Sequence, residues 1–211
     1  TAFAPRPPDE ALRRMLGLEG RFVLGYVSNL GRREGLDILL DGIARLVQTR
    51  PHVACLVVGD GPELGALQRQ VRRLGLSQVV RLTGAVPHEQ VQRYYSLIDL
   101  FVVPRRDDEA ARWVTPLKPF EAMAMARPLL VADLPALREV VAPGQRGMTF
   151  RPEDPTDLAR VAAVLMDDPV LLRRLGSAGR EWVERERTWA ANGERYVHAY
   201  GRLGVQPGAR T

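Results

Sequence analysis

The sequence has little of several residue types: one cysteine, one lysine, three histidines and 6% aromatic residues among 211. Cys55 has no second cysteine with which to pair, so a disulfide-stabilised class is excluded and a reducing compartment fits. No stretch approaches the roughly 18 apolar residues of a membrane span. The first residues, TAFAPRPPDE, lack the basic and apolar regions of a signal peptide and read as a linker or as a cut inside a longer protein.

The charge of the chain is positive but evenly spread. The net charge of +5 and the pI of about 10.0 permit anionic partners such as phosphates, nucleic acid or an acidic membrane surface. Of the 30 basic residues, 29 are arginines, and Lys118 is the single lysine. Stretches such as GREWVERERTW interleave both signs, as a solvated helix face does, so we expect no nucleic-acid partner.

Short apolar runs alternate with longer segments of helical periodicity. The strand candidates are nearly all apolar, as expected for parallel strands buried on both faces. They are RFVLGYVS, VACLVVGD, VVRLTG, DLFVVP, PLLVAD and, more weakly, GMTF. This order predicts an α/β fold, namely a single Rossmann-like, doubly wound parallel sheet of about six strands with a helical C-terminal extension. We expect a linker and leading helix at 1–19, the Rossmann-like domain at 20–153, helices at 154–204 and a frayed tail at 205–211.

Ligands of open parallel sheets bind beyond the carboxyl ends of the strands, so the loops there are the candidate sites. The first loop, SNLGRREG (28–35), carries glycines and two arginines ahead of a helix, which suits either a phosphate-binding turn or a plain connection. The second loop, GDGPE (59–63), suits either a close approach to a ligand or simply a tight turn before a helix.

The loop after the fourth strand leads into PLKPFEAMAMA. Pro116 and Pro119 suit the first turn of a helix that begins near Leu117, where free N–H groups and the ammonium of Lys118 would favour a phosphate. Glu121 lies three residues beyond Lys118 on the same helix face, so it suits either a ribose diol or an ion pair with Lys118. The acids at 107–109 are adjacent and splay apart, and we expect no metal there.

The segments GYVSNLGRREGLDILLDGIARL, LVVGDGPE, VVRLTGAVPHEQVQRYYSLIDLFVVP, TPLKPFEAMAMARPLLVADLPALREVV and WAANGERYVHAYGRL together resemble a known family. The chain is similar, over roughly residues 20–204, to the C-terminal, nucleotide-sugar-binding domain of retaining glycosyltransferases of the GT-B fold, specifically glycosyltransferase family 4. The Thr-Pro-Leu-Lys loop before Glu-Ala-Met-Ala resembles one subset of that family.

The resemblance implies a UDP- or GDP-sugar as donor, no tightly bound cofactor and no metal. It places Glu121 on the ribose hydroxyls, the loop Thr115–Lys118 on the diphosphate and residues 81–86 beside the base. We expect Lys118 and Glu121 to act in catalysis. The residues expected to bind the donor are Asn29, Gly31, Arg32, Gly59, Arg81, Val86, Arg106, Thr115, Pro116, Leu117, Lys118 and Glu121.

Some positions depart from the family pattern. Asn29 and Glu34 stand where many members have an Arg and a Lys that bind the diphosphate, and Trp113 stands where the first of two glutamates is usual. Pro135-Ala136 replaces a common Gly-Gly. Lys118, with Arg32, Arg33 or Arg106, is the candidate source of the missing positive charge.

The resemblance implies the donor-binding half of a retaining glycosyltransferase, and we expect the acceptor domain to lie upstream of Thr1. We expect the chain alone to bind nucleotide without transferring sugar, and the helix near 189–203 to cross back to the other domain. A nucleotide-sugar 2-epimerase and a non-catalytic nucleotide-binding module remain alternatives; the former needs ionisable groups, and the histidines are His52, His88 and His198. Two locations stay open: the cytoplasm, and the inner face of a membrane reached through the missing half.

Overall fold

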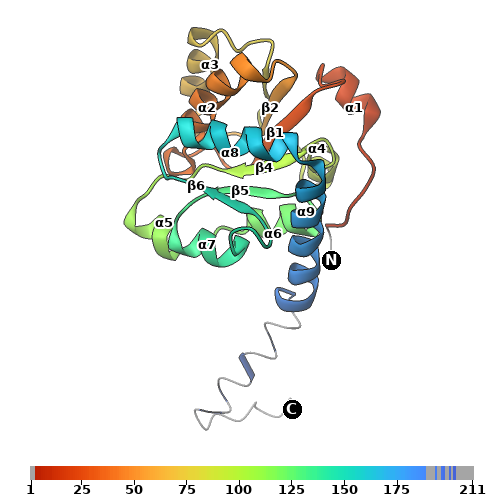
Figure 1. Cartoon of the computed structure of the whole chain (residues 1–211), viewed down its shortest axis with the longest axis vertical. Coiled ribbons are helices and arrows are strands. Elements are labelled where there is room, and N and C mark those ends of the chain that lie inside the picture. The colour runs from red at the N-terminus through yellow and green to blue at the C-terminus, as the bar shows by residue number, and fades with distance from the viewer. Residues whose placement is uncertain (1–2, 189–192, 194–195, 198–199, 201, 203–211) are drawn as a thin grey trace.

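The computed structural model describes residues 3–188, 193, 196–197, 200 and 202. The fold is α/β: a parallel sheet of six strands with flanking helices and a helical C-terminal part, as the sequence predicts. In Figure 1, α2 and α3 lie above the strands, α5, α6 and α7 lie below them, and α9 runs down the right-hand side. The predicted tail at 205–211 and most of the predicted crossing helix at 189–203 lie outside the described residues.

The strand order is β3-β2-β1-β4-β5-β6, and all neighbouring strands are parallel. The side of β1 to which the chain adds strands changes once, and we call this change the strand-order reversal. The chain moves outward from β1 (Phe22–Val27) through β2 (Val53–Val58) to β3 (Val80–Leu82). It then returns to the other side of β1 and continues through β4 (Leu100–Val103), β5 (Leu129–Ala132) and β6 (Met148–Phe150). The reversal therefore lies between β1 and β4, and the crevice at their carboxyl ends is where such sheets bind ligands.

The strands are central because their side chains are apolar on both faces. Every residue of β2, β4 and β5 is buried, which matches the continuous apolar runs of the sequence. Three aromatic rings occupy the core below the carboxyl edge: Tyr26 and Tyr95 each stack on Phe101, with ring centroids 6.1 and 5.5 Å apart. The hydroxyls of Tyr26 and Tyr95 donate to the carboxylates of Glu34 and Glu121 respectively.

The helices before the strand-order reversal are α1 (Glu10–Met15), α2 (Leu36–Thr49), α3 (Leu64–Arg73) and the short α4 (Val91–Tyr95), with two 3-10 turns, η1 (Arg32–Glu34) and η2 (His88–Gln90). After it come α5 (Glu109–Trp113), α6 (Lys118–Ala124), α7 (Pro135–Val141), α8 (Pro155–Asp167) and α9 (Pro169–Glu186). Asp154 and Asp168 cap α8 and α9 ahead of prolines, because their carboxylates accept from the first free N–H groups of each helix.

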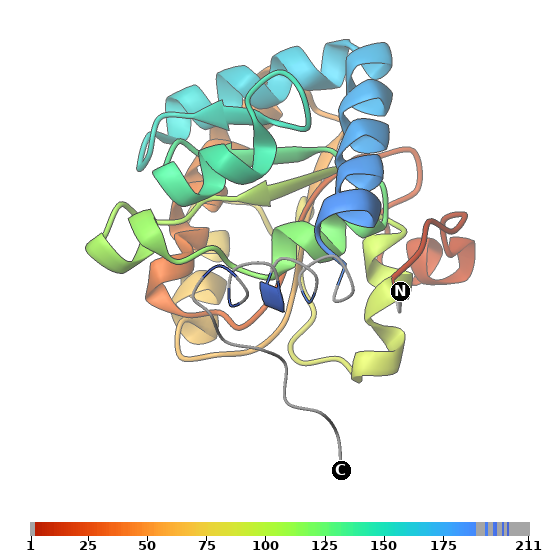
Figure 2. The same ribbon diagram turned by 90° about the horizontal axis from the view of Figure 1, so that it is seen from below.

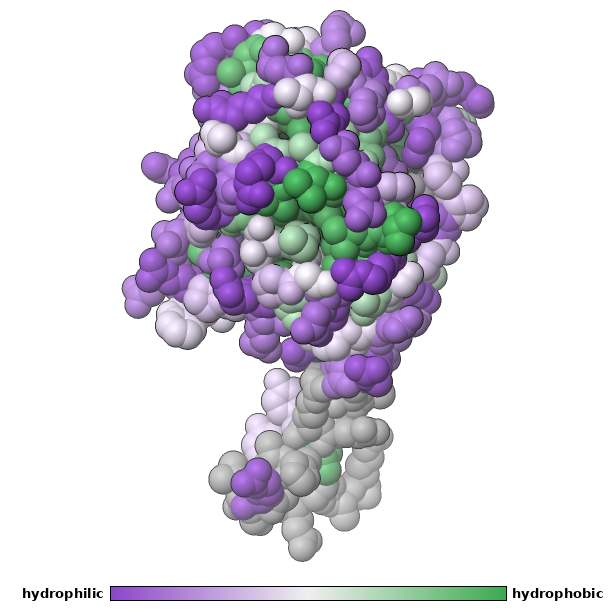
Figure 3. All heavy atoms as spheres, in the orientation of Figure 1, coloured by the Kyte–Doolittle hydropathy of each residue, from purple (hydrophilic) through white to green (hydrophobic). Residues whose placement is uncertain are grey.

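The C-terminal helices pack back onto the sheet domain. Helix α8 lies against α2, and α9 lies against α6, which Figure 2 shows from below. Gly176 and Gly179 of α9 allow this closeness, because a Cβ at Gly176 would stand 2.4 Å from the Ala126 carbonyl oxygen. The face drawn in Figure 3 is mostly hydrophilic, with hydrophobic atoms gathered near its centre. No described helix is both long and apolar enough to cross a membrane.

Candidate functional site

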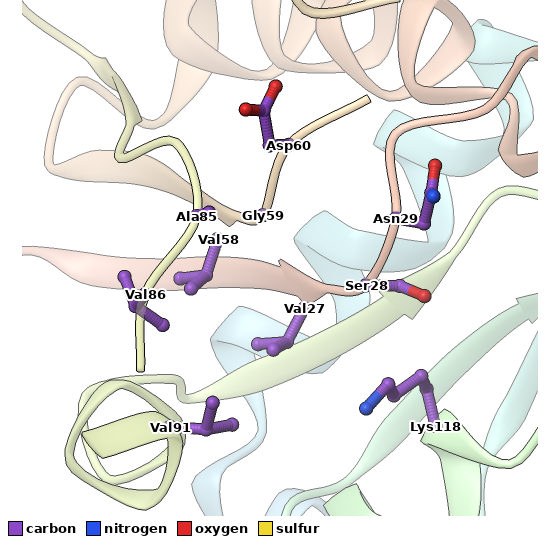
Figure 4. Close-up of a pocket in the computed structure, with 10 residues that line it drawn as sticks. All are labelled: Val27, Ser28, Asn29, Val58, Gly59, Asp60, Ala85, Val86, Val91 and Lys118. Atoms are coloured by element: carbon purple, nitrogen blue, oxygen red, sulfur yellow. The ribbon is translucent and has the colours of Figure 1, made fainter. Parts of the chain in front are cut away.

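A hollow of about 300 Å³ opens at the carboxyl edge of the sheet, beside the strand-order reversal. Its walls come from the ends of β1 and β2, the loop after β3, the first residue of α4 and the first residue of α6 (Figure 4). The lining residues are Val27, Ser28, Asn29, Val58, Gly59, Asp60, Ala85, Val86, Val91 and Lys118. We call this hollow the edge pocket. Its volume lies at the lower end of the range typical of small-molecule sites, about 300–1,000 Å³.

The floor of the edge pocket is made by two interlocked loops. Gly59 has φ +139°, and a Cβ there would stand 1.8 Å from the carbonyl oxygen of Ser28. The Leu30 N–H donates to the Asp60 carbonyl at 2.9 Å, and the Glu63 N–H donates back to the Leu30 carbonyl at 3.0 Å. The glycines of GDGPE therefore serve a close contact between loops, in addition to forming the pocket wall.

Lys118 provides the positive charge of the edge pocket: among its described lining residues no other is cationic. Figure 4 shows the Lys118 side chain reaching from α6 towards Val27 and Val91. Helix α6 begins at Lys118 with Leu117 at the N-cap and a proline in its first turn, as the sequence predicts. In the described part of the chain, the N–H groups of Thr115, Leu117 and Lys118 donate to no other backbone group.

Glu121 is held by two donors. The Lys118 Nζ lies 2.9 Å from both Glu121 carboxylate oxygens, and the Tyr95 hydroxyl donates to Oε2 at 3.1 Å. Burial raises the pKa of Tyr95 well above its usual value, and the Glu121 charge adds to the shift, so this tyrosine remains a neutral donor. Of the two roles that the sequence allows for Glu121, the structure shows the ion pair with Lys118, in which both side chains are partly exposed.

The structure divides the predicted donor-binding residues among several places. Asn29, Gly59, Val86 and Lys118 line the edge pocket. Thr115, Pro116, Leu117 and Glu121 lie next to it, before and within α6. Gly31, Arg32 and Arg106 line a second hollow, of about 540 Å³, together with Arg33, Asp107, Asp108 and Glu153.

Arg81 lies away from the edge pocket. Its guanidinium donates to the carbonyl oxygens of Leu16 at 2.6 Å and Ser77 at 3.1 Å, so it fastens the end of α1 to the sheet. The strand alternates its side chains, and this position points to neither hollow. Only the Val86 end of the predicted segment 81–86 reaches the pocket wall.

The arginines of the second hollow are largely neutralised. Arg106 pairs with Asp37 and, at 2.6 Å, with Glu153, while Arg33 pairs with Asp108 at 2.9 Å. Arg32 is exposed and has no ion-pair partner among the described residues. Four basic residues were candidates for the positive charge missing from the first loop. Within the described ranges, two of them, Arg33 and Arg106, pair with acids away from the edge pocket, whereas Lys118 and Arg32 do not.

Two of the acids at 107–109 have partners within their own loop and helix. Asp107 pairs with Arg112 at 2.6 Å, and this hydrogen bond lowers the pKa of Asp107. Asp108 caps α5 by accepting from the Ala111 N–H at 2.7 Å. Across the described residues, no group of three His, Cys, Asp or Glu side chains is placed to hold a metal ion.

Three residues near the site escape the sequence reading. Tyr95 reads as one of a Tyr pair in a short helix, and its link to Glu121 depends on a contact between distant segments. Asp60 follows a strand and stands between glycines, a signal that is visible in the sequence. Nothing in the sequence around Arg105 marks it as part of a site. Its buried guanidinium donates to the Glu34 carboxylate and to the Val114 carbonyl.

Several known proteins are similar to this chain in sequence. The chain is 31% identical over 196 residues to the GDP-mannose-dependent alpha-(1-6)-phosphatidylinositol monomannoside mannosyltransferase of Mycolicibacterium smegmatis, which covers 92% of this chain and 51% of that protein. It is 26% identical to the alpha-D-kanosaminyltransferase of Streptomyces kanamyceticus, over 92% of this chain and 49% of that one. The chain thus spans about half the length of the curated relatives it matches.

Solved structures share the fold. HepE of Anabaena in complex with UDP-glucose superposes with a TM-score of 0.83 at 23% identity, covering 95% of this chain and 54% of that one. The C-terminal domain of the group 1 family protein LpcC from Francisella tularensis gives 0.76 at 17% identity and is itself covered to 97%, with 89% of this chain matched. The sequence profile described as "Glycosyl transferases group 1" matches residues 21–168. The chain therefore belongs to the group 1 glycosyl transferase family.

Proposed function

We propose that this chain is the donor-binding part of a retaining glycosyltransferase, and that the edge pocket takes the nucleoside diphosphate of a UDP- or GDP-sugar. One observation carries the proposal: Lys118, the first residue of α6, meets the ends of β1 and β2 and the loop after β3 around one hollow at the carboxyl edge of the sheet. Open α/β sheets bind nucleotides at this place.

The walls of the edge pocket suggest how the donor is oriented. Ala85, Val86 and Val91 form an apolar side that suits the flat base. Lys118 lines the pocket and suits the diphosphate, and we propose that the N–H groups of Thr115 and Leu117, which bond to no other backbone group, assist it. Glu121 lies three residues beyond Lys118 and suits the ribose. Its carboxylate can accept one hydrogen bond from each of two neighbouring hydroxyls.

The chemical task of this part is to stabilise the leaving group. When the bond between the sugar and the diphosphate oxygen breaks, negative charge develops on that oxygen. The acceptor oxygen bonds to the sugar, and the proton of the acceptor hydroxyl passes to the leaving phosphate. The Lys118 ammonium exchanges part of its contact with Glu121 for the phosphate oxygens, which places positive charge where negative charge forms. Arg32, at the rim of the neighbouring hollow, is the second cation proposed for this role.

The acceptor would bind to the remainder of a longer protein. The curated relatives are about twice as long as this chain, which supports a second, acceptor-binding domain on the opposite side of the donor. Trp113, Val114 and Leu117 expose 76%, 55% and 74% of their surface beside α6 and would contact that domain or the acceptor. We propose that the chain alone binds nucleotide and transfers no sugar; transfer by the purified chain would contradict this.

The alternative functions have less support. A nucleotide-sugar 2-epimerase needs ionisable groups at the sugar, but His52 lies before β2 at the far edge, His88 lies in η2, and His198 is outside the described residues. The relatives named above are glycosyltransferases, which favours a transferase over a non-catalytic nucleotide-binding module. We place the protein in the cytoplasm, where a free thiol such as the buried Cys55 is stable.

A thermal-shift screen with UDP, GDP, UDP-glucose and GDP-mannose tests the proposal, because a ligand that binds only the folded chain raises its melting temperature. Ala85 is exposed and lines the edge pocket, so Ala85→Trp fills the pocket without entering the core. Ala11, exposed on α1, gives the control Ala11→Trp. We expect a shift in the wild type and in A11W but none in A85W. An equal shift in A85W would place the nucleotide elsewhere.

A further inference from the structure

The loop after β1 and the loop after β4 are held together at the strand-order reversal. The Arg106 N–H donates to the Arg33 carbonyl at 3.0 Å. Gly35, with φ +66°, lies so close to the other loop that a Cβ would stand 2.1 Å from the Pro104 carbonyl oxygen. A displacement of one loop is therefore transmitted to the other.

A charged pair is buried between these loops. The Glu34 carboxylate accepts from the Tyr26 hydroxyl at 2.7 Å and from the Arg105 guanidinium at 3.4 Å. The Glu34 and Arg105 side chains are only 18% and 9% exposed. Arg105 also donates through Nη1 to the Val114 carbonyl at 2.8 Å, while its buried Nε has no partner among the described residues.

Val114 is the last residue before the segment Thr115–Lys118, which ends at Lys118 in the lining of the edge pocket. Its N–H is bound to the Ala110 carbonyl at 2.8 Å, and its carbonyl is bound by Arg105, so both of its backbone groups are fixed. We propose that Glu34 and Arg105 are positioning residues: their ion pair links the loop after β1 to the Val114 carbonyl and so fixes Thr115–Lys118 at the edge pocket.

Many family members have a cation at the position of Glu34 that binds the diphosphate directly. In this chain, Glu34 would instead act through Arg105. Without Glu34, the guanidinium of Arg105 would be a buried charge with no carboxylate, and it would turn towards water or recruit another acceptor. Either movement would release the Val114 carbonyl and loosen the segment that follows. We expect the loosened segment to weaken binding of the diphosphate and to leave binding of the base unchanged. This expectation rests on the proposed function.

The test combines two measurements on Glu34→Gln and Arg105→Lys. Glu34→Gln keeps the shape and an acceptor for Tyr26 but removes the charge, and Arg105→Lys keeps the charge but loses the fork that spans Glu34 and Val114. Asp157→Asn is the matched control, because Asp157 is a buried carboxylate paired with Arg160 at 2.7 Å on α8, away from the pocket.

The first measurement is amide hydrogen exchange at Val114, Phe120 and Glu121, and it needs no ligand. Their N–H groups flank the segment and are bonded to the carbonyls of Ala110 and Leu117. We expect faster exchange at these amides in E34Q and R105K, and no change there in D157N. Exchange as slow as in the wild type in both variants would overturn the positioning role, whether or not a nucleotide binds.

The second measurement is calorimetric binding of UDP and of uridine to the same proteins. We expect E34Q and R105K to bind UDP roughly tenfold more weakly, the loss that one misplaced hydrogen bond to a charged group produces, with uridine binding unchanged. Equal UDP binding in wild type and variants would also overturn the inference, while leaving the nucleotide site intact. Absence of UDP and GDP binding in the wild type would instead refute the proposed function, and the exchange data would still decide the positioning role.

Discussion

Replacing Gly59 by alanine perturbs the floor of the edge pocket at its tightest point. The new Cβ would stand 1.8 Å from the Ser28 carbonyl oxygen and 3.6 Å from the Leu30 side chain, in a backbone conformation with φ +139° that side chains rarely adopt. The end of β2 must therefore move away from the end of β1, and the hydrogen bond from the Gly59 N–H to the Gly84 carbonyl at 3.0 Å moves with it.

The size of the effect follows from two terms. A strained backbone costs about 1–3 kcal/mol, and forcing an atom into a packed contact costs about 1–3 kcal/mol. The sum, about 2–6 kcal/mol, is a large part of a typical unfolding free energy of about 5–15 kcal/mol. For a domain of this size it corresponds to a fall in melting temperature of about 5–20 °C.

Urea denaturation with and without saturating UDP measures the Gly59→Ala effect on folding and on binding together. The control is Gly65→Ala in α3, where the nearest atom to the new Cβ is the end of the Arg69 side chain, at 3.6 Å. We expect Gly65→Ala to raise stability by about 0.5–1 kcal/mol through helix propensity. A Gly59→Ala protein as stable as the wild type, with unchanged UDP binding, would refute the account of this floor.

Two further predictions concern buried groups. Tyr95→Phe removes the hydroxyl that donates to Glu121 at 3.1 Å, and we expect the unfolding free energy to fall by about 1–2 kcal/mol in urea titrations; no change would show that this hydrogen bond contributes nothing. Burial raises the pKa of Asp99, although the Val23 N–H bonds to its carboxylate. Protonation of Asp99 therefore stabilises the fold fully below its unfolded pKa of roughly 3.9, and this contribution is lost as pH rises through the folded pKa. Asp99→Asn should gain stability relative to the wild type between pH 4 and pH 7, and a difference independent of pH would contradict this.

The order of elements was accessible from the sequence because each strand is an unbroken apolar run. Runs such as VACLVVGD have the composition of strands buried on both faces, and the structure places β2 there with every residue buried. The prolines around Lys118 located the start of α6, since proline is tolerated only in the first turn of a helix. Local rules of this kind do not depend on the rest of the chain.

The site was only partly predictable because its remaining geometry depends on contacts between distant segments. Whether Arg106 faces a ligand or pairs with Asp37 is decided by the place of α2, 69 residues away in sequence. The role of Glu34 depends on Tyr26 and Arg105, which meet only once β1 and β4 are neighbours. A departure from a family pattern that looked like a lost cation is thus, in the fold, one member of a buried pair.

The measurement that tests the central claim most directly is calorimetric titration of the chain with UDP and GDP, comparing wild type with Lys118→Ala. The control is Arg173→Ala, which removes one positive charge beside a hollow at the opposite edge of the sheet. The account predicts that the wild type and R173A bind at least one of the two nucleotides equally well, and that K118A binds it roughly tenfold more weakly or worse. Unchanged affinity in K118A, or no binding of either nucleotide by the wild type, would contradict it.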